Sequence, residues 1–148
     1  TLIIFTMPGA DLGSKIIKQE IRKFTKINKN SLFYESLGQK NYFSFLNQVD
    51  AIIGNSSSGI LEMPYFQKPT LNLGMRQIGR LHPKSIINVK INKNDILKSI
   101  RKIYSSKFKK NIKNDKKFYG DGNSSKRIIK VLRKLNTKNL FQKRFFNY

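Results

Sequence analysis

The 148-residue sequence contains no cysteine, a single histidine and only eight acidic residues. The lack of cysteine excludes disulfides and thiolate metal ligands and fits a reducing compartment, so we expect a cytoplasmic protein without a metal or other cofactor. No apolar run approaches the roughly 20 residues that span a bilayer, and no secretory signal is present, so we expect no membrane partner. The histidine, His82, lies in a predicted loop, and we expect no catalytic role for it.

Positive charge is abundant where negative charge is scarce, and the net charge is +22. Residues 1–100 carry 14 basic and 6 acidic side chains, whereas residues 101–148 carry 16 and 2. A basic module that binds nucleic acid is one interpretation of the second segment. The basic residues are mostly lysines scattered among Asn and Ile, however, and no nucleic-acid motif is recognisable. We therefore interpret them as a solvated surface and expect no nucleic-acid partner.

The length suits one domain, and short apolar runs alternate with amphipathic segments along it. The expected strands are residues 2–6, 31–35, 51–53, 69–73 and 85–89. The expected helices are residues 14–24, 42–49, 60–66, 92–104 and 128–135. We expect a polar loop at residues 107–117, a tight turn at 119–123, and a flexible basic tail at 138–148 after a domain of residues 1–137.

This alternation predicts an α/β fold with a doubly wound parallel sheet. Ligands of such sheets bind beyond the carboxyl ends of the strands. The segments that follow the expected strands are the turn at Met7, the turn Ser36–Gly38, the serine-rich turn after Ile53 and the loop Arg76–Arg80. We therefore expect these turns to line one edge of the sheet together.

Residues 50–64, DAIIGNSSSGILEMP, read as a strand, a turn of small residues and the start of a helix. The first amides of a helix lack partners within it and attract anions, which makes this arrangement suitable for phosphate. Glycines at 54 and 59 allow backbone to approach a ligand closely. The turn can also supply three hydroxyl donors, those of Ser56, Ser57 and Ser58. Glu62 lies too close to this site to bind phosphate itself, and it suits neutral hydroxyls such as a ribose diol.

A purely structural interpretation of the same turn is a capped helix. Ser or Asn at the N-cap, with Glu62 near the third helical position, would form an ordinary capping box. The turn by itself leaves both interpretations open.

Five motifs follow one another along the chain: PGAD at 8–11 with Lys15, IGNSSSGILE at 53–62, KPTLNLG at 68–74, RQIGR at 76–80 and YGDGN at 119–123. In this order they resemble the C-terminal domain of hydrolysing UDP-N-acetylglucosamine 2-epimerases, in particular the sialic-acid branch. The resemblance implies part of a Rossmann-like C-terminal lobe of the two-lobe, glycosyltransferase-B architecture. It covers residues 1–135, and the start at Thr1 leads us to expect a piece of a longer chain that lacks the N-terminal lobe.

The resemblance also implies a UDP site. Ser56, Ser57, Ser58 and Gly59 would bind the diphosphate, and Arg76 would neutralise phosphate charge. Glu62 would hold the ribose hydroxyls, and the backbone at Leu37 would meet the uracil. The family takes its catalytic groups from segments outside this chain, so the chain alone is expected to be inactive.

The implied reaction of the whole protein eliminates UDP from UDP-N-acetylglucosamine and adds water to give N-acetylmannosamine, a precursor of sialic acids. The resemblance also implies a homo-oligomer. Three alternatives remain: an epimerase acting on a UDP-2,4-diacetamido sugar, a glycosyltransferase of the same architecture, and the basic nucleic-acid-binding module.

Overall fold

The structure is a computed structural model that describes residues 1–136. The chain divides into two compact units, one formed by Thr1–Val49 and one that begins at Asp50. The tail predicted at residues 138–148 lies outside the described residues.

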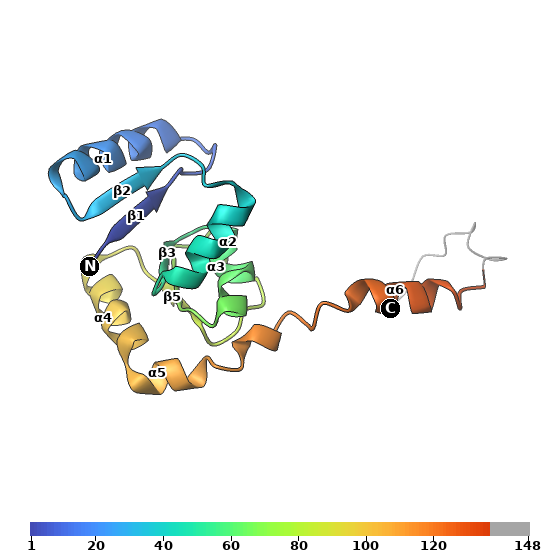
Figure 1. The fold of residues 1–148 in the computed structure, drawn as a ribbon. Coiled ribbons are helices and arrows are strands. Elements are labelled where there is room, and N and C mark those ends of the chain that lie inside the picture. The colour runs from blue at the N-terminus through green and yellow to red at the C-terminus, as the bar shows by residue number, and fades with distance from the viewer. Residues whose placement is uncertain (137–148) are drawn as a thin grey trace, which may run out of the picture. The chain divides into compact units, whose positions relative to one another are not determined.

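The first unit is a two-stranded parallel sheet with helices following each strand (Figure 1). Its elements are β1 (Ile3–Thr6), α1 (Ser14–Ile27), β2 (Ser31–Tyr34) and α2 (Gly38–Gln48). The register pairs Ile3 with Ser31 and Thr6 with Tyr34. Helix α1 covers one face of this sheet, where the rings of Phe5 and Phe24 meet edge to face with 5.6 Å between their centroids.

The second unit is built on a three-stranded parallel sheet in the order β3-β4-β5. Its strands are β3 (Ile52–Gly54), β4 (Thr70–Leu73) and β5 (Ile86–Val89). Its helices are α3 (Ser57–Leu61), the 3₁₀ helix η1 (Met63–Phe66), α4 (Lys93–Tyr104), α5 (Ser106–Asn111), the 3₁₀ helix η2 (Asp115–Lys117) and α6 (Ser124–Leu132). The core of the unit is the buried cluster of Leu71, Val89, Ile103, Phe108 and Ile112.

The predicted α/β fold class is confirmed, because every described strand pair is parallel and helices alternate with strands. The strands form two sheets, however, where the sequence predicted one. The start of α4 is also confirmed, since the Asn92 side chain accepts a hydrogen bond from the Asp95 amide over 2.9 Å.

Two predicted elements differ from the structure. The helix expected at residues 60–66 begins earlier, at Ser57, and becomes 3₁₀ after Leu61 because Pro64 cannot donate a backbone hydrogen bond. The loop expected at residues 107–117 instead contains α5 and η2. Phe108 and Ile112 of that segment are buried in the core, which the surrounding lysines concealed in the sequence.

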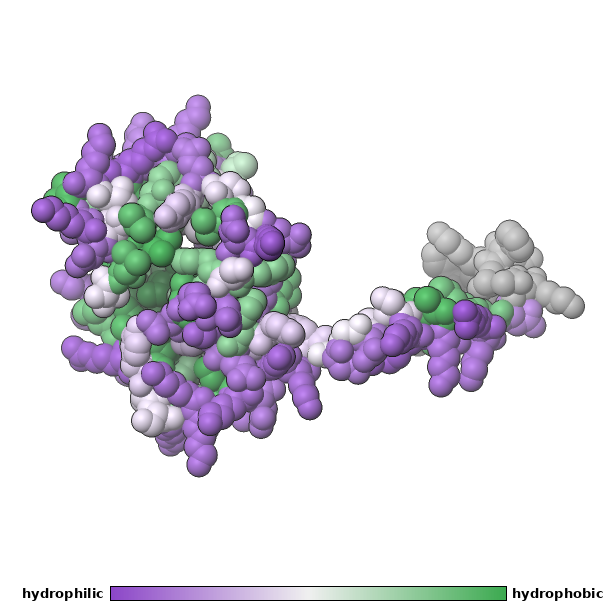
Figure 2. Space-filling view, in the orientation of Figure 1, coloured by the Kyte–Doolittle hydropathy of each residue, from purple (hydrophilic) through white to green (hydrophobic). Residues whose placement is uncertain are grey.

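Helix α6 carries several apolar side chains that stay exposed in the part of the chain that the structure describes. Its exposed apolar residues include Ile128, Ile129, Val131 and Leu132, and Figure 2 shows apolar and hydrophilic residues gathered on different sides of this segment. Up to residue 136, no helix combines the length and the apolar character needed to cross a bilayer.

Candidate functional site

The serine turn, residues 55–58, connects β3 to α3. Ser56 is the N-cap of α3, and its hydroxyl accepts a hydrogen bond from the Ser58 amide over 3.3 Å. The first amides of a helix have no partners within it, so this end of α3 carries positive potential. Ser56 and Ser57 are exposed, and their hydroxyl groups can reach a ligand.

Gly59 seats α3 against the sheet. It is buried, and its carbonyl accepts a hydrogen bond from the Thr70 hydroxyl over 2.7 Å. A Cβ at this position would lie 2.7 Å from Cγ2 of Thr70, closer than two carbon atoms can approach. Only glycine therefore lets α3 lie this close to β4, which fixes the start of α3 beside the carboxyl ends of the strands.

Glu62 is held by the serine turn. Its carboxylate accepts a hydrogen bond from the Ser58 hydroxyl over 2.5 Å. It stands at the C-cap of α3, whereas the third helical position is Gly59, so the capping box proposed from the sequence does not form. The capped-helix interpretation is correct for Ser56 and wrong for Glu62, whose position leaves it able to accept from hydroxyl groups.

The loop of residues 75–80 follows β4 and is tied to the serine turn. Gln77 in this loop is buried, and its Nε2 donates a hydrogen bond to the backbone carbonyl of Asn55 over 2.8 Å. Arg76, the residue before it, is exposed. The structure thus joins the loop of Arg76 to the turn of Ser56. The sequence motif RQIGR contained Gln77 but gave no reason to single it out.

The turn at residues 119–123 contacts the chain just after this loop and then leads into α6. The Tyr119 hydroxyl donates to the carbonyl of Leu81 over 2.8 Å, and burial raises the pKa of Tyr119 while the charge of Arg80 opposes the rise. In the next turn, hydrogen bonds from Asn123 and then from Arg127 lower the pKa of Asp121 to about 2. The predicted turn at 119–123 is therefore an ordered connection to α6.

His82 lies in the loop between β4 and β5, as predicted. Its Nδ1 is 3.2 Å from the Pro83 carbonyl, and its Nε2 is 3.2 Å from Nδ2 of Asn88. A carbonyl can only accept, so we assign the proton to Nδ1 and the acceptor role to Nε2. Asn88 in turn accepts from Asn72 over 2.7 Å. These contacts give His82 a structural place in the loop.

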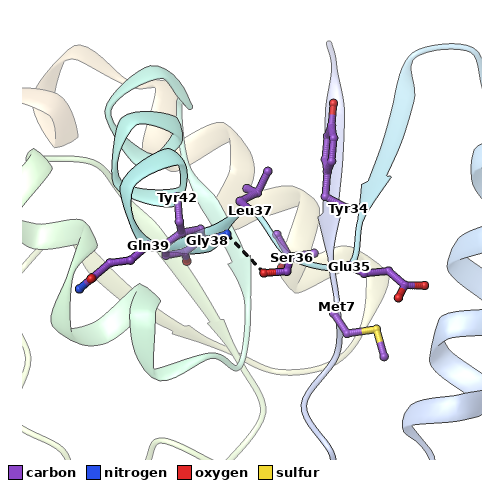
Figure 3. Close-up of a pocket in the computed structure, with 9 residues that line it drawn as sticks. Met7, Tyr34, Glu35, Ser36, Leu37, Gly38, Gln39 and Tyr42 are labelled. Carbon is purple, nitrogen blue, oxygen red and sulfur yellow. Dashed lines mark hydrogen bonds between the residues drawn. The ribbon is translucent and has the colours of Figure 1, made fainter.

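The first unit contains a cavity of about 330 Å³ at the carboxyl ends of β1 and β2 (Figure 3). Thr6 at the end of β1 and Met7 just after it line one side, and residues 34–39 and Tyr42 line the other from the end of β2, the turn that follows and the start of α2. Leu37 is among them. Ser36 accepts a hydrogen bond from the Gly38 amide over 3.3 Å, and the φ of +65° at Gly38 turns the chain into α2.

Glu35 is the acidic side chain of this cavity. In Figure 3 it points toward α1, where Lys18 Nζ and Arg22 Nη2 lie 2.6 and 2.8 Å from one carboxylate oxygen. The hydrogen bond and charge of Lys18, with a smaller contribution from Arg22, lower the pKa of Glu35. Glu35 is therefore a carboxylate at neutral pH, paired with α1.

The predicted site residues thus fall into two groups. Ser56, Ser57, Ser58, Gly59, Glu62 and Arg76 belong to the second unit, and Leu37 belongs to the first. In the first unit, the turns at Met7 and at Ser36 line the same cavity. In the second unit, a hydrogen bond joins the Arg76 loop to the serine turn. A second cavity, of about 310 Å³, is lined by residues 50, 67–69, 103–104, 109 and 112–113, and none of the predicted site residues is among them. Among residues 1–136, no three His, Asp or Glu side chains gather in a way that could hold a metal ion.

Similarity to known proteins indicates the family to which the chain belongs. The sequence model of the family described as UDP-N-acetylglucosamine 2-epimerase matches residues 1–133. The chain is 36% identical over 147 residues to the GDP/UDP-N,N'-diacetylbacillosamine 2-epimerase (hydrolyzing) of Campylobacter jejuni, covering 98% of this chain and 38% of the relative.

Two further relatives are 30% identical to the chain. One is the polysialic acid biosynthesis protein P7 of Escherichia coli, with 97% of this chain and 37% of the relative covered. The other is the UDP-N-acetylglucosamine 2-epimerase of Neisseria meningitidis, with 98% and 38% covered. The chain thus spans well under half the length of these relatives. It belongs to the UDP-N-acetylglucosamine 2-epimerase family.

Proposed function

We propose that this chain is the UDP-binding portion of a hydrolysing UDP-sugar 2-epimerase. Residues 1–137 would form part of the C-terminal lobe of the whole enzyme. The observation that carries the proposal is the hydrogen-bonded assembly of the serine turn, Glu62 and the Arg76 loop at the carboxyl ends of β3 and β4, in a chain of this family.

In this proposal the diphosphate lies against the start of α3. The hydroxyl groups of Ser56 and Ser57 donate to phosphate oxygens, and the Arg76 guanidinium neutralises phosphate charge. Ser58 contributes by holding Glu62 through their 2.5 Å hydrogen bond. Gly59 contributes by letting α3 pack on β4.

Glu62 and Leu37 would hold the nucleoside. An ionised carboxylate only accepts hydrogen bonds, which suits the two hydroxyl groups of a ribose. Leu37 lines the cavity at the end of β2, and its peptide groups would pair with the uracil edge.

The reaction of the whole protein would remove the C2 proton of the sugar, break the C1–oxygen bond and release UDP. Addition of water to the resulting glycal then gives the free 2-epimer, so UDP-N-acetylglucosamine and water yield N-acetylmannosamine and UDP. The residues described here bind and orient the leaving group. The base and acid for the proton transfers would come from outside this chain.

The sugar could also be a 2,4-diacetamido sugar. The relative with 36% identity is named for N,N'-diacetylbacillosamine and a relative with 30% identity for N-acetylglucosamine. The free 2-epimer of either substrate would be an amino sugar that serves as a precursor of nine-carbon acidic sugars, which occur in surface polysaccharides. We place the enzyme in the cytoplasm, acting as a homo-oligomer.

The test is a direct assay of the intact protein that carries these 148 residues. It is incubated in parallel with UDP-N-acetylglucosamine and with UDP-N,N'-diacetylbacillosamine, and released UDP and free sugar are measured. We expect UDP and the free 2-epimer from one of them. Sugar transferred to an added acceptor, with no free 2-epimer, would instead identify a glycosyltransferase, and release of neither product would refute the proposal for both substrates.

A further inference from the structure

Gln77 is a buried polar side chain in an otherwise exposed loop. Its neighbours Met75, Arg76 and Ile78 are all exposed, whereas only 5% of Gln77 is accessible to solvent. Burying an amide is unfavourable unless hydrogen bonds replace those lost to water. The hydrogen bonds of this amide therefore indicate why the side chain is buried.

One end of the amide has a partner and the other does not. Nε2 donates to the carbonyl of Asn55 over 2.8 Å. Because a carbonyl only accepts, this bond fixes the orientation of the amide. Oε1 then points the other way, where it is buried without a hydrogen-bond partner among the described residues. The single bond to Asn55 thus holds the side chain in place against the cost of an unsatisfied acceptor.

This bond joins two segments that are 22 positions apart in sequence. Asn55 immediately precedes the N-cap Ser56, and Gln77 immediately follows Arg76. Two backbone hydrogen bonds described within residues 75–80, from the Ile78 amide to Met75 and from the Arg80 amide to Gln77, are local turns. Neither of these two backbone hydrogen bonds reaches the serine turn. The Gln77 side chain therefore connects the loop to the serine turn where they do not.

We propose that Gln77 is a positioning residue that sets the distance between the Arg76 guanidinium and the hydroxyl groups of the serine turn. The ligand class that this spacing favours is a nucleoside diphosphate, whose phosphates need both segments at once. A nucleoside without phosphates needs neither. The inference rests on the proposed function, because it assumes that the diphosphate lies between these segments.

The experiment compares UDP with uridine in the intact protein and its Gln77→Leu variant. Leu keeps the approximate volume and removes both polar atoms. The loss of one neutral hydrogen bond should weaken UDP binding by roughly two- to tenfold, while uridine affinity stays within about twofold. The matched control is Gln19→Leu, because Gln19 is an exposed glutamine on α1, and it should bind both ligands as the wild type does.

A second variant adds a pH-dependent readout, taken from the affinity for UDP relative to that for uridine because a general fold defect would affect both ligands. In Gln77→Glu, the ionised carboxylate cannot donate to the Asn55 carbonyl, but the protonated acid can. Burial raises the pKa of a carboxyl group. We therefore expect UDP affinity, relative to wild type at the same pH, to recover as the pH falls from about 8 to about 5.5. Gln19→Glu should show no such recovery.

The possible results distinguish failure of the positioning role of Gln77 from failure of the proposed UDP-binding function. Wild-type protein that fails to bind UDP would refute the proposed function and this inference with it. If the wild type binds UDP, three results would overturn the positioning role alone: unchanged UDP affinity in Gln77→Leu, equal losses for UDP and uridine, or a pH-independent defect in Gln77→Glu.

Discussion

At the scale of single residues, Glu62 and Arg76 carry the charges that the proposed site would use. We expect Glu62→Ala and Arg76→Ala each to weaken UDP binding by about 1.5–3 kcal/mol, the range for a lost charge-assisted hydrogen bond. Titration calorimetry of the intact protein with UDP measures both. Ser58→Ala should cost less than Glu62→Ala, because it removes a hydrogen bond that orients the carboxylate and leaves the carboxylate itself in place.

The control for Arg76→Ala is Lys98→Ala, which removes one positive charge from the exposed surface of α4. On a chain with a net charge of +22, any lost cation could slightly reduce the attraction of an anion. Equal losses in the two variants would mean that Arg76 acts through net charge. Unchanged UDP affinity in both Glu62→Ala and Arg76→Ala would place the pocket elsewhere.

Residue types in the serine turn were sufficient to predict a cap and a hydroxyl-rich turn, because those tendencies are local. The partner of Glu62 was not predictable in the same way. Whether Glu62 reached back to the N-cap or to Ser58 depended on where α3 began, and the sequence placed that start three residues late. Gln77 was missed because the only described partner of its side chain is 22 positions away, a contact that no local pattern encodes.

At the scale of elements, the close packing of α3 on β4 depends on Gly59. We expect Gly59→Ala to lower the free energy of unfolding by about 1–3 kcal/mol, as overpacking typically does. The added methyl group would lie 2.7 Å from Cγ2 of Thr70, a stiff β-branched side chain on a strand. Urea denaturation followed by circular dichroism measures the change, and Ser57→Ala in the same helix is the exposed control.

A double variant tests the cause of that loss. Thr70→Ser removes Cγ2 but retains the hydroxyl that donates to the Gly59 carbonyl. Adding it to Gly59→Ala should restore part of the lost stability, because the methyl group then has room. If Thr70→Ser leaves the effect of Gly59→Ala unchanged, the close contact is not its source.

Elements with strong periodicity or clear caps were predictable, and α4 with its Asn92 cap is an example. Helix α5 and η2 were not, because Lys107, Lys109 and Lys110 dominate the local composition. Tertiary contacts order this segment. Phe108 enters the core, and Asp115 accepts a 2.6 Å hydrogen bond from the amide of Ser85, thirty positions earlier.

At the scale of the whole molecule, the parallel α/β class followed from the alternation of strands and helices, but the number of sheets did not. Alternation fixes the order of elements along the chain and says little about which strands pair. The register of β3, β4 and β5 requires contacts between segments about 16 to 18 positions apart. Nothing in the run of residues 1–49 showed that its two strands would pair only with each other.

The two units should differ in local stability. Of the nine buried hydrophobic residues described, eight lie beyond Asp50, and the first unit contributes only Leu46. A two-stranded sheet is marginal in water unless other elements cover it, whereas β4 is paired on both sides. We therefore expect backbone amides of β1 and β2 to exchange hydrogen for deuterium faster than those of β3, β4 and β5 in this chain.

Native-state exchange at increasing urea distinguishes local opening from global unfolding. If the first unit opens by itself, its amides should exchange through a step of lower free energy and weaker urea dependence, because less surface becomes exposed. Equal protection with equal urea dependence would mean that both units unfold together. Addition of UDP extends the test, since a ligand that contacts both Leu37 and the serine turn must slow exchange in both units. Protection confined to the second unit would exclude Leu37 from the UDP site.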